Sequence, residues 1–296
     1  MNCLPMQRNT GMLLAVLIAA CCLLCSLPTA AARERAWNVT SLTNYSLDPV
    51  YNKGCYFEPT TEGKFPVLVL VHGAGGPEKP YFWMPFLMNR WIRMGVVIPM
   101  VVVMPHVEKL KDRSYGIPDF GEFVSLGRFK ALVEYIKAGK LTSKADTSAP
   151  ISMTGYSMGG SATLFAGVKH RDFLFNIGGL SPSWTFYDGT RGYITDPDEM
   201  IFSNNDNGHF VMGYGAGEPS QHHKNVLRYN ETLSKNGHNK PGMFRIYEAP
   251  AVSSKGQPLG HAWELFSREI FYFLYYLKFG STPSADLVEK ACEIEG

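Results

Sequence analysis

Short apolar runs rich in β-branched residues recur along the chain, and segments of helical length separate them. The clearest run covers residues 65–71, FPVLVLV, in which no position is charged. A strand that is apolar at every position suits burial on both faces, as in a parallel sheet, whereas a half-exposed strand alternates apolar and polar residues. Similar runs predict further strands at 95–104, 151–155, 175–180, 210–214 and 244–249.

Segments with helical character lie between these runs. They are predicted as helices at 81–94, 120–138, 161–169, 221–236 and 262–279. Strands that alternate with helices of this length form βαβ units, so we expect an α/β fold with a mostly parallel central sheet and helices on both faces. Neither an internal repeat nor a long Pro/Gly/Ser-rich linker divides residues 37–296, and we therefore expect a single domain there.

The first 32 residues predict a secretory signal peptide. Arg8 precedes the apolar run GMLLAVLIAACCLLCSL, which is followed by Pro28 and the small residues at 29–32. A basic start, an apolar middle and an Ala-x-Ala cleavage site are the parts of such a signal. An uncleaved membrane anchor is the alternative, because the run approaches the length that spans a bilayer. Lipid attachment at Cys21 is a further alternative.

Export would place the mature chain in an oxidising compartment. Only Cys55 and Cys292 lie outside the signal region, and we expect them to form a disulfide, with two unpaired buried thiols as the alternative. The sequons at Asn38, Asn44 and Asn230 are glycosylation sites only if the source is a eukaryote.

The charge balance excludes partners that need a strong electrostatic field. The formal net charge is +2, and 18% of the residues are charged. We therefore expect no nucleic-acid partner, and membrane contact only through an uncleaved or lipidated N-terminus. The hydrophobic fraction of 45% is typical of a globular protein.

Ser157 lies in the segment ISMTGYSMGG, between a predicted strand and a predicted helix. Residues 155–159 match the pattern G-x-S-x-G, in which a serine occupies a sharp strand-to-helix bend. The glycines let strand and helix approach closely, and the N-terminus of the helix offers N–H groups to a developing oxyanion. We predict that Ser157 is a nucleophile; a turn that needs glycine only for backbone reasons is the alternative.

The glycine-rich segment HGAGG directly follows the first apolar strand. The N–H of Ala74 or Gly75 is expected to form an oxyanion hole together with the N–H of Met158. A purely structural turn is the alternative, and a phosphate-binding loop is disfavoured because the Lys-Ser/Thr pair of the Walker pattern is absent. His72 is expected to support the turn.

His261 follows the last predicted strand and a loop rich in Pro, Ser and Gly. A histidine there can serve as general base to the serine and then as general acid to the leaving group. His222, His223 and His238 fall on or near a predicted surface helix, and His106 precedes the serine, against the serine–acid–histidine order of such folds. We expect no metal site, because neither H-E-x-x-H nor paired cysteines at zinc spacing occur in the mature chain.

The acid that orients this histidine is expected to be Glu218, in the segment GAGEP after the strand at 210–214. That position lies one strand before the histidine loop. A solvated loop carboxylate is the alternative for Glu218. Nearby aspartates are the other candidates for the acid: Asp188, Asp196, Asp198 and Asp206.

The ordered motifs HGAGG, VVVMP, GYSMGG, LSPSW, GAGEP and GHAWELF resemble an esterase family within the α/β-hydrolases. That family takes in esterase D-like enzymes, feruloyl and acetyl-xylan esterases, siderophore esterases and mycolyltransferases. The resemblance runs from about Phe65 to Lys278 and implies an α/β-hydrolase fold and a serine carboxylesterase, with Ser157 as nucleophile and His261 as base. Many members carry aspartate at the position of Glu218, although a glutamate can hold an imidazole in the same way.

We therefore expect an exported serine carboxylesterase that needs no cofactor and acts on a small-molecule or polymer-linked ester. An acyltransferase of the same fold is one alternative. A non-catalytic binding protein is another, although such proteins typically lose the serine or the histidine. The aromatic segments at 81–83 and 184–187 either line a substrate pocket or pack within the fold.

Overall fold

The computed structural model describes residues 40, 43–48, 52–74, 76, 78–107, 116–170, 172–183, 186–194, 208–235 and 244–293. The predicted signal peptide and Gly75 lie outside the described residues.

An eight-stranded sheet with the order β1-β2-β4-β3-β5-β6-β9-β10 forms the centre of the molecule. From β4 to β10 every neighbouring pair is parallel, whereas β2 is antiparallel to β4 and β1 to β2. The prediction of a mostly parallel sheet is therefore confirmed. The strands are β1 Thr43–Asp48, β2 Asn52–Phe57, β3 Val67–Val71, β4 Val101–Pro105, β5 Ile151–Tyr156, β6 Leu174–Leu180, β9 Phe210–Gly215 and β10 Phe244–Ala249.

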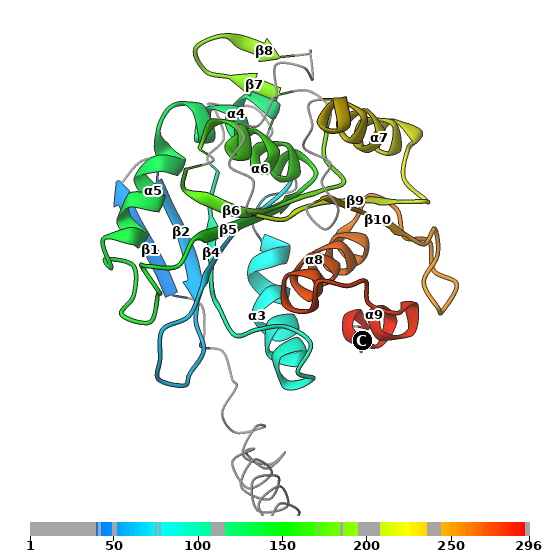
Figure 1. The fold of residues 1–296 in the computed structure, drawn as a ribbon, viewed down its shortest axis with the longest axis horizontal. Helices are drawn as coiled ribbons and strands as arrows, with labels where there is room; N and C mark the ends of the chain where they lie inside the picture. The colour runs from blue at the N-terminus through cyan, green and yellow to red at the C-terminus, as the bar shows by residue number, and fades with distance from the viewer. Residues whose placement is uncertain are drawn as a thin grey trace, which may run out of the picture.

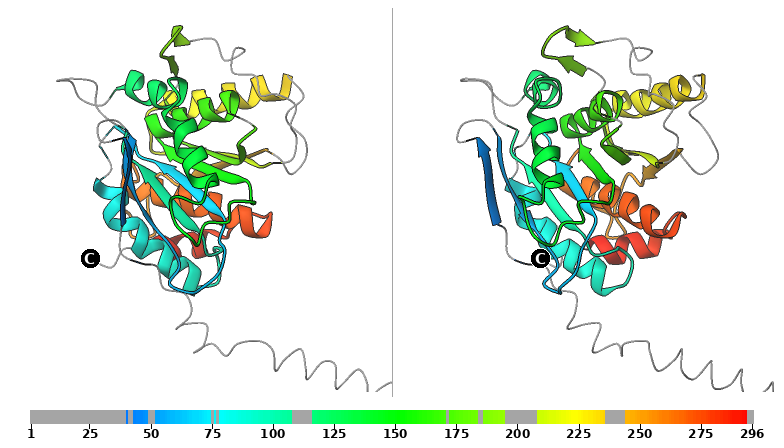
Figure 2. Two further views of the ribbon diagram at one scale, coloured as in Figure 1. Left: turned by 90° about the vertical axis from the view of Figure 1, so that its left-hand side faces the viewer. Right: turned by 60° about the vertical axis from the view of Figure 1, so that its left-hand side comes forward.

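Helices cover both faces of this sheet (Figure 1). One face carries α4 Ile117–Ser125, α5 Arg128–Lys137, α6 Met158–Lys169 and α7 Ser220–Lys235. The other carries α3 Glu78–Arg93, α8 Trp263–Phe279 and α9 Ala285–Cys292, and Figure 2 shows the sheet between the two helical layers. A small hairpin of β7 Phe186–Asp188 and β8 Gly192–Ile194 lies beyond α4.

The apolar character of β3 is explained by burial on both faces. Val67, Val69 and Val71 pack into the core beneath α4, α5 and α6, whereas Leu68 and Leu70 pack into the core beneath α3 and α8. Because successive strand side chains point to opposite faces, every position of such a strand is inside the molecule.

Most predicted elements have bounds within three residues of those in the structure, but two predictions differ more. The segment predicted as one helix at 120–138 is two helices, because Gly127 adopts φ 85° between α4 and α5. Only glycine enters this left-handed region without a steric penalty, so the helix ends there and restarts in a new direction. The strand predicted from residue 95 begins at Val101, after Gly95 with φ 71°.

The predicted disulfide is not formed. Cys55 lies on β2 opposite Met104 of β4, whereas Cys292 ends α9 and its Sγ lies 3.7 Å from the carbonyl oxygen of Ser267 on α8. Both cysteines are buried, and no disulfide joins them. A disulfide needs its two Cβ atoms about 4 Å apart and facing each other, and these two residues have different packing partners.

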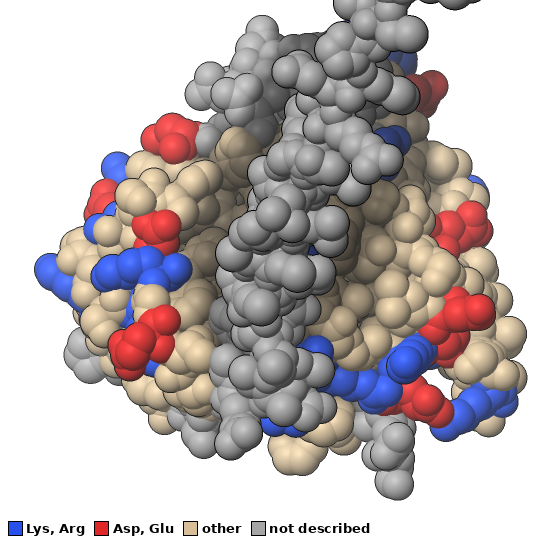
Figure 3. All heavy atoms as spheres, turned by 60° about the horizontal axis from the view of Figure 1, so that its bottom comes forward, with Lys and Arg blue, Asp and Glu red and all other residues tan. Residues whose placement is uncertain are grey.

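Acidic and basic side chains are interspersed on the face seen in Figure 3, in keeping with the small formal net charge of +2. Within the part of the chain that the structure describes, no helix has both the length and the apolar character that a membrane crossing requires.

Candidate active site

Ser157 occupies the bend between β5 and α6. Its φ of 55° and ψ of −125° are outside the regions that non-glycine residues ordinarily adopt. The bend is held by a 2.9 Å hydrogen bond from the N–H of Ser157 to the carbonyl oxygen of Leu180 on β6. Strained backbone of this kind costs about 1–3 kcal/mol and is concentrated at functional sites.

The glycines around Ser157 are required by close packing. A Cβ atom at Gly159 would overlap the carbonyl oxygens of Val71 and His72, and one at Gly160 would lie 2.6 Å from the carbonyl oxygen of Leu180. Close backbone packing therefore explains why residues 159 and 160 are glycines. It does not explain why Ser157 adopts a strained conformation.

His261 lies on the loop between β10 and α8. Its Nε2 is 2.8 Å from Oγ of Ser157, which is hydrogen-bonding distance. Phe266 of α8 meets the imidazole edge-to-face at a centroid distance of 4.9 Å. The side chain of His261 is 29% exposed, so the reacting side of the ring can be reached from solvent.

Glu218 contacts the other nitrogen of the same imidazole. Its Oε1 is hydrogen-bonded to Nδ1 of His261, and the carboxyl group is only 1% exposed. Its Oε2 accepts two further hydrogen bonds, each 2.7 Å long, from the N–H of Gly215 and the hydroxyl of Ser181. Burial acts to raise the pKa of Glu218, but the hydrogen bonds from His261, Gly215 and Ser181 outweigh it and hold the pKa below its ordinary value of 4.5.

The structure thus brings Ser157, His261 and Glu218 into one hydrogen-bonded row, although 104 and 43 positions separate His261 from the other two along the chain. All three follow the carboxyl ends of parallel strands, where the ligand sites of such sheets occur. An imidazole between a hydroxyl and an ionised carboxylate can take the hydroxyl proton and make the oxygen nucleophilic.

Of the alternative acids, the one that the structure describes, Asp188, is not part of this row. Asp188 is buried, but Lys169 and Thr190 bind its carboxylate. The other three aspartates, Asp196, Asp198 and Asp206, lie outside the described residues.

Backbone N–H groups surround the serine. The first intrahelical hydrogen bond of α6 runs from the N–H of Ser161 to the carbonyl oxygen of Ser157, so the N–H of Met158 precedes the hydrogen-bonded part of the helix. The loop after β3 passes close by, because a Cβ at Gly73 would lie 3.1 Å from Cβ of Ser157. The next residue, Ala74, is exposed.

His72 supports this loop, as predicted. Its Nδ1 lies 2.8 Å from the carbonyl oxygen of Gly73, and its Nε2 accepts the N–H of Val107 at 3.1 Å. The ring is 1% exposed, and burial lowers the pKa of His72 to about 4, so the imidazole is neutral at physiological pH.

Sequence reasoning missed two residues that contact this row, His222 and Ser181, and a third, Glu269, that contacts Ser181. His222 falls on a predicted surface helix, yet its ring stacks on that of His261. Ser181 and Glu269 lie behind Glu218, and Ser181 has a positive φ of 41°. The available signal for Glu269 was an acidic residue directly before the apolar and aromatic segment IFYFLYY of a predicted helix.

Glu218, His222 and His261 are close enough to be considered as metal ligands, because they offer ligand atoms within 4.8 Å of one another. However, both ring nitrogens of His261 already contact Glu218 and Ser157. The two imidazole planes are within 21° of parallel, so their in-plane lone pairs do not converge on one point. The arrangement fits hydrogen bonding better than metal coordination.

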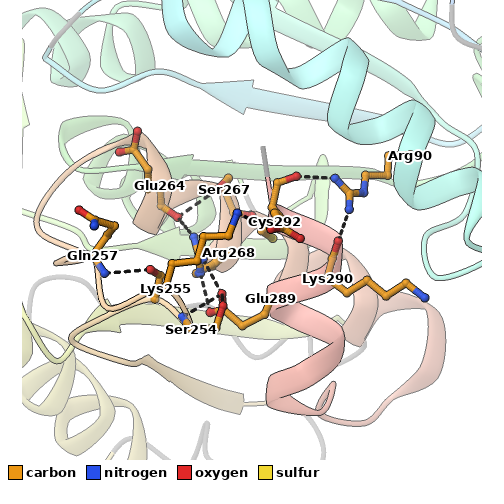
Figure 4. A network of polar contacts seen from close by, with 12 residues as sticks. Arg90, Ser254, Lys255, Gln257, Glu264, Ser267, Arg268, Glu289, Lys290 and Cys292 are labelled. Carbon is orange, nitrogen blue, oxygen red and sulfur yellow. Dashed lines mark hydrogen bonds and ion pairs between the residues drawn. The ribbon is translucent and has the colours of Figure 1, made fainter. Parts of the chain in front are cut away.

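The loop that carries His261 is hydrogen-bonded to α9 (Figure 4). Glu289 of α9 accepts hydrogen bonds from Ser254 of the loop, at 3.0 Å from the hydroxyl, and from Arg268 of α8, at 3.0 Å from Nη2. Arg268 also donates to the carbonyl oxygen of Glu264 at 2.8 Å. One carboxylate therefore links the histidine loop to two helices.

Comparison with solved structures identifies the fold. The ferulic acid esterase AmCE1/Fae1A of Anaeromyces mucronatus matches with a TM-score of 0.60 and 15% identity over 80% of this chain and 90% of that one. The feruloyl esterase module of Clostridium thermocellum matches with a TM-score of 0.56 and 16% identity over 84% and 91%. An esterase of Pyrobaculum calidifontis matches with a TM-score of 0.54 and 13% identity over 94% and 96%.

No model of a protein family matches the sequence, and no curated protein matches it significantly. At the identities of the structural matches, the likeness establishes the fold alone. The chain has the α/β-hydrolase fold.

Proposed function

We propose that the protein is an exported serine carboxylesterase that acts through an acyl-enzyme intermediate. The observation that carries the proposal is the hydrogen-bonded row of Ser157, His261 and Glu218, with the serine on a strained bend. A merely structural serine would not need this conformation together with a buried, ionised carboxylate behind its histidine partner.

In the first half-reaction, Oγ of Ser157 attacks the acyl carbon of the ester while Nε2 of His261 accepts the hydroxyl proton. Glu218 accepts the hydrogen bond from the Nδ1–H of His261 and stabilises the imidazolium that forms. The imidazolium then protonates the leaving alkoxide, and an alcohol departs. In the second half-reaction His261 takes a proton from water while the water oxygen attacks the acyl carbon of the acyl-enzyme. The imidazolium then returns the proton to Oγ of Ser157, and the acid departs.

The oxyanion of each tetrahedral intermediate would accept hydrogen bonds from the N–H groups of Met158 and of Ala74 or Gly75. The position of Met158 at the first turn of α6 supports its role, because the positive end of the helix points at the developing charge. A donor of this kind typically contributes about 10²- to 10³-fold to kcat.

A narrow apolar crevice beside Met158 favours small acyl groups. It has a volume of roughly 10 Å³, room for about one water-sized group, and its walls include Phe120, Phe165 and Phe186. Acetyl esters are therefore the first substrates to test, with butyryl esters as a comparison that should fit less well. Methyl ferulate belongs beside them, because two of the structural matches are feruloyl esterases.

The test compares the purified protein with its Ser157→Ala variant on p-nitrophenyl acetate, p-nitrophenyl butyrate and methyl ferulate. We expect hydrolysis by the wild type and a loss of about 10⁴-fold or more in the variant. With the two p-nitrophenyl esters, added methanol distinguishes ester hydrolysis from acyl transfer, since a transferase would give mainly the methyl ester. Full activity of Ser157→Ala would contradict the proposal.

Export is supported by the layout of residues 1–32 alone, and N-terminal sequencing of protein collected from the medium tests it. We expect Arg33 as the first residue. Retention of the full chain in the membrane fraction would instead indicate an uncleaved anchor.

A further inference from the structure

A second carboxyl group lies directly behind Glu218. It belongs to Glu269 of α8, which is 0% exposed and lies 88 positions from Ser181 along the chain. The hydroxyl oxygen of Ser181 is 3.0 Å from each oxygen of Glu269 and 2.7 Å from Oε2 of Glu218. One buried serine therefore connects the two carboxyl groups.

The single hydroxyl hydrogen of Ser181 restricts the protonation state of Glu269. The hydroxyl of Ser181 carries one hydrogen, and carboxylates only accept hydrogen bonds. The shortest of its three contacts is with Glu218, so that hydrogen is donated to Glu218. The contact with Glu269 is then a hydrogen bond only if Glu269 carries a proton and donates it to Ser181.

The surroundings of Glu269 also favour its protonated form. Among the described residues, the titratable groups whose charges act on Glu269 are Glu218, after β9, and Tyr247, on β10, and neither is a cation. Burial, and then the charge of Glu218, raises the pKa of Glu269 well above its ordinary value of 4.5. Two ionised carboxylates on one serine would repel each other in a medium of low dielectric constant.

The fold makes room for this carboxyl group. A Cβ atom at Gly213 of β9 would lie 2.5 Å from Oε1 of Glu269, so the absence of a side chain on the strand lets Glu269 reach Ser181. Ser181 is itself 0% exposed, and its N–H donates to the carbonyl oxygen of Gly213 at 2.7 Å. Glu269 on α8, Ser181 after β6 and Glu218 after β9 are thus each held in place by a regular element of the fold.

We propose that Glu269 is a positioning residue: as a neutral carboxylic acid it donates to Ser181, which orients the serine hydroxyl toward Glu218 and thereby fixes the carboxylate that holds His261. This role rests on the proposed esterase function. Glu269 exchanges no proton during the reaction; Glu218 stays ionised, and the only proton that moves is the one between Ser157, His261 and the leaving group or water.

The test uses Glu269→Gln, Glu269→Leu and Ser181→Ala in the full protein. Glutamine keeps a donor for Ser181, so we expect kcat within about 3-fold of the wild type, whereas leucine removes the donor and should lower kcat about 10-fold or more, as expected for a weakened hydrogen bond to a charged group. KM should stay unchanged in both, because Glu269 does not touch substrate. Thermal unfolding of each variant shows that it is folded.

Ser181→Ala should lower kcat by at least as much as Glu269→Leu. Because Glu269 acts through Ser181, the double variant Ser181→Ala/Glu269→Leu should match Ser181→Ala within about 2-fold. A folded Glu269→Leu variant with wild-type kcat, or a double variant in which the two losses multiply, would overturn the proposal. So would a Glu269→Gln variant as impaired as Glu269→Leu, since glutamine keeps the donor.

An infrared measurement separates this proposal from the esterase function. At neutral pH the wild type should show the C=O stretch of a buried carboxylic acid, and Glu269→Gln should lack it. The measurement needs no substrate, so it reports the protonation state of Glu269 even if the wild type hydrolyses no ester. A lack of ester hydrolysis would count against the esterase function only. A wild-type spectrum without that band at neutral pH would overturn the protonated state of Glu269.

Discussion

The imidazole of His222 lies face to face with the imidazole of His261, with ring centroids 4.3 Å apart and ring planes at 21°. His222 lies in the first turn of α7, four positions after Glu218, and its Nδ1 lies 3.4 Å from the carbonyl oxygen of Pro182. Burial, and then the charge of His261, lowers the pKa of His222. His222 therefore presents a neutral aromatic face to the ring that becomes positively charged during the proposed reaction.

Removing this aromatic face should slow the reaction. We expect His222→Ala to lower kcat about 2- to 10-fold, because stacked aromatic pairs contribute about 0.5–1.5 kcal/mol. His222→Phe keeps a ring and should retain most of the activity. Steady-state kinetics on p-nitrophenyl acetate measure both, and equal losses in the two variants would show that stacking is not the reason.

Loss of the carboxylate of Glu218 should slow the reaction more than loss of the ring of His222. Glu218→Gln can present its amide to the ring and favour the wrong tautomer, and we expect kcat to fall about 10³- to 10⁴-fold. Glu218→Asp keeps the charge with a shorter reach and should lose less. If Glu218→Gln kept near-full kcat, another acid would have to orient His261.

Protonation of Glu269 predicts how stability depends on pH. Its pKa is higher in the folded protein than the ordinary value of 4.5, so above about pH 4.5 the folded state binds more protons than the unfolded state. The contribution of Glu269 to stability is therefore fully present below pH 4.5 and is lost as pH rises toward the folded pKa, by at most about 1.4 kcal/mol per pH unit.

Urea unfolding of the wild type and Glu269→Gln between pH 4.5 and 8 measures this effect. Because glutamine does not titrate, the variant should gain stability relative to the wild type as pH rises. A difference between the two proteins that is constant with pH would contradict a raised pKa.

The carboxylate of Glu289 should contribute to stability. In Glu289→Gln the guanidinium of Arg268, whose side chain is 6% exposed, loses its charged partner. We expect the free energy of unfolding to fall by about 1–3 kcal/mol. Glu134→Gln is the matched control, because its pair with Lys130 is exposed and 3.9 Å long, and it should change stability by less than about 0.5 kcal/mol. Equal effects would contradict the role assigned to Glu289.

The glycine after the serine should not accept a side chain. Gly159→Ala would place its Cβ on the backbone of Val71 and His72, which cannot move without disturbing β3, whereas a Cβ at Gly260 meets nothing within 4 Å. We therefore expect Gly159→Ala to lower both the melting temperature and kcat, and Gly260→Ala to leave the melting temperature nearly unchanged. A Gly159→Ala protein as stable and active as the wild type would contradict the close packing at the bend.

The order of elements made the site predictable. Ser157, Glu218 and His261 each follow a strand that is apolar enough to recognise, and parallel strands bring their carboxyl ends to one edge. The central strands were predictable for the same reason. In contrast, β1 (TNYSLD) and β2 (NKGCYF) contain no continuous apolar run, and β2 includes Gly54, which left no comparable signal.

The support behind the site was not predictable from local sequence. Ser181 and Glu269 meet only because β6 and α8 pack together, and no short pattern links positions so far apart. His222 occupies an amphipathic helix, where a solvated side chain is the ordinary expectation. Gly127 lies within an apolar helical pattern, and that pattern did not reveal the left-handed backbone that divides the predicted helix.

A fluorophosphonate probe tests the central claim most directly, because it reacts with a serine that is activated by a base and needs no knowledge of the natural ester. After incubation, peptide mass spectrometry should find one adduct on Ser157 in the wild type, none in Ser157→Ala, and strongly slowed labelling in His261→Ala. A wild-type protein that remains unlabelled, or that is labelled equally fast without His261, would contradict a nucleophilic Ser157 activated by His261.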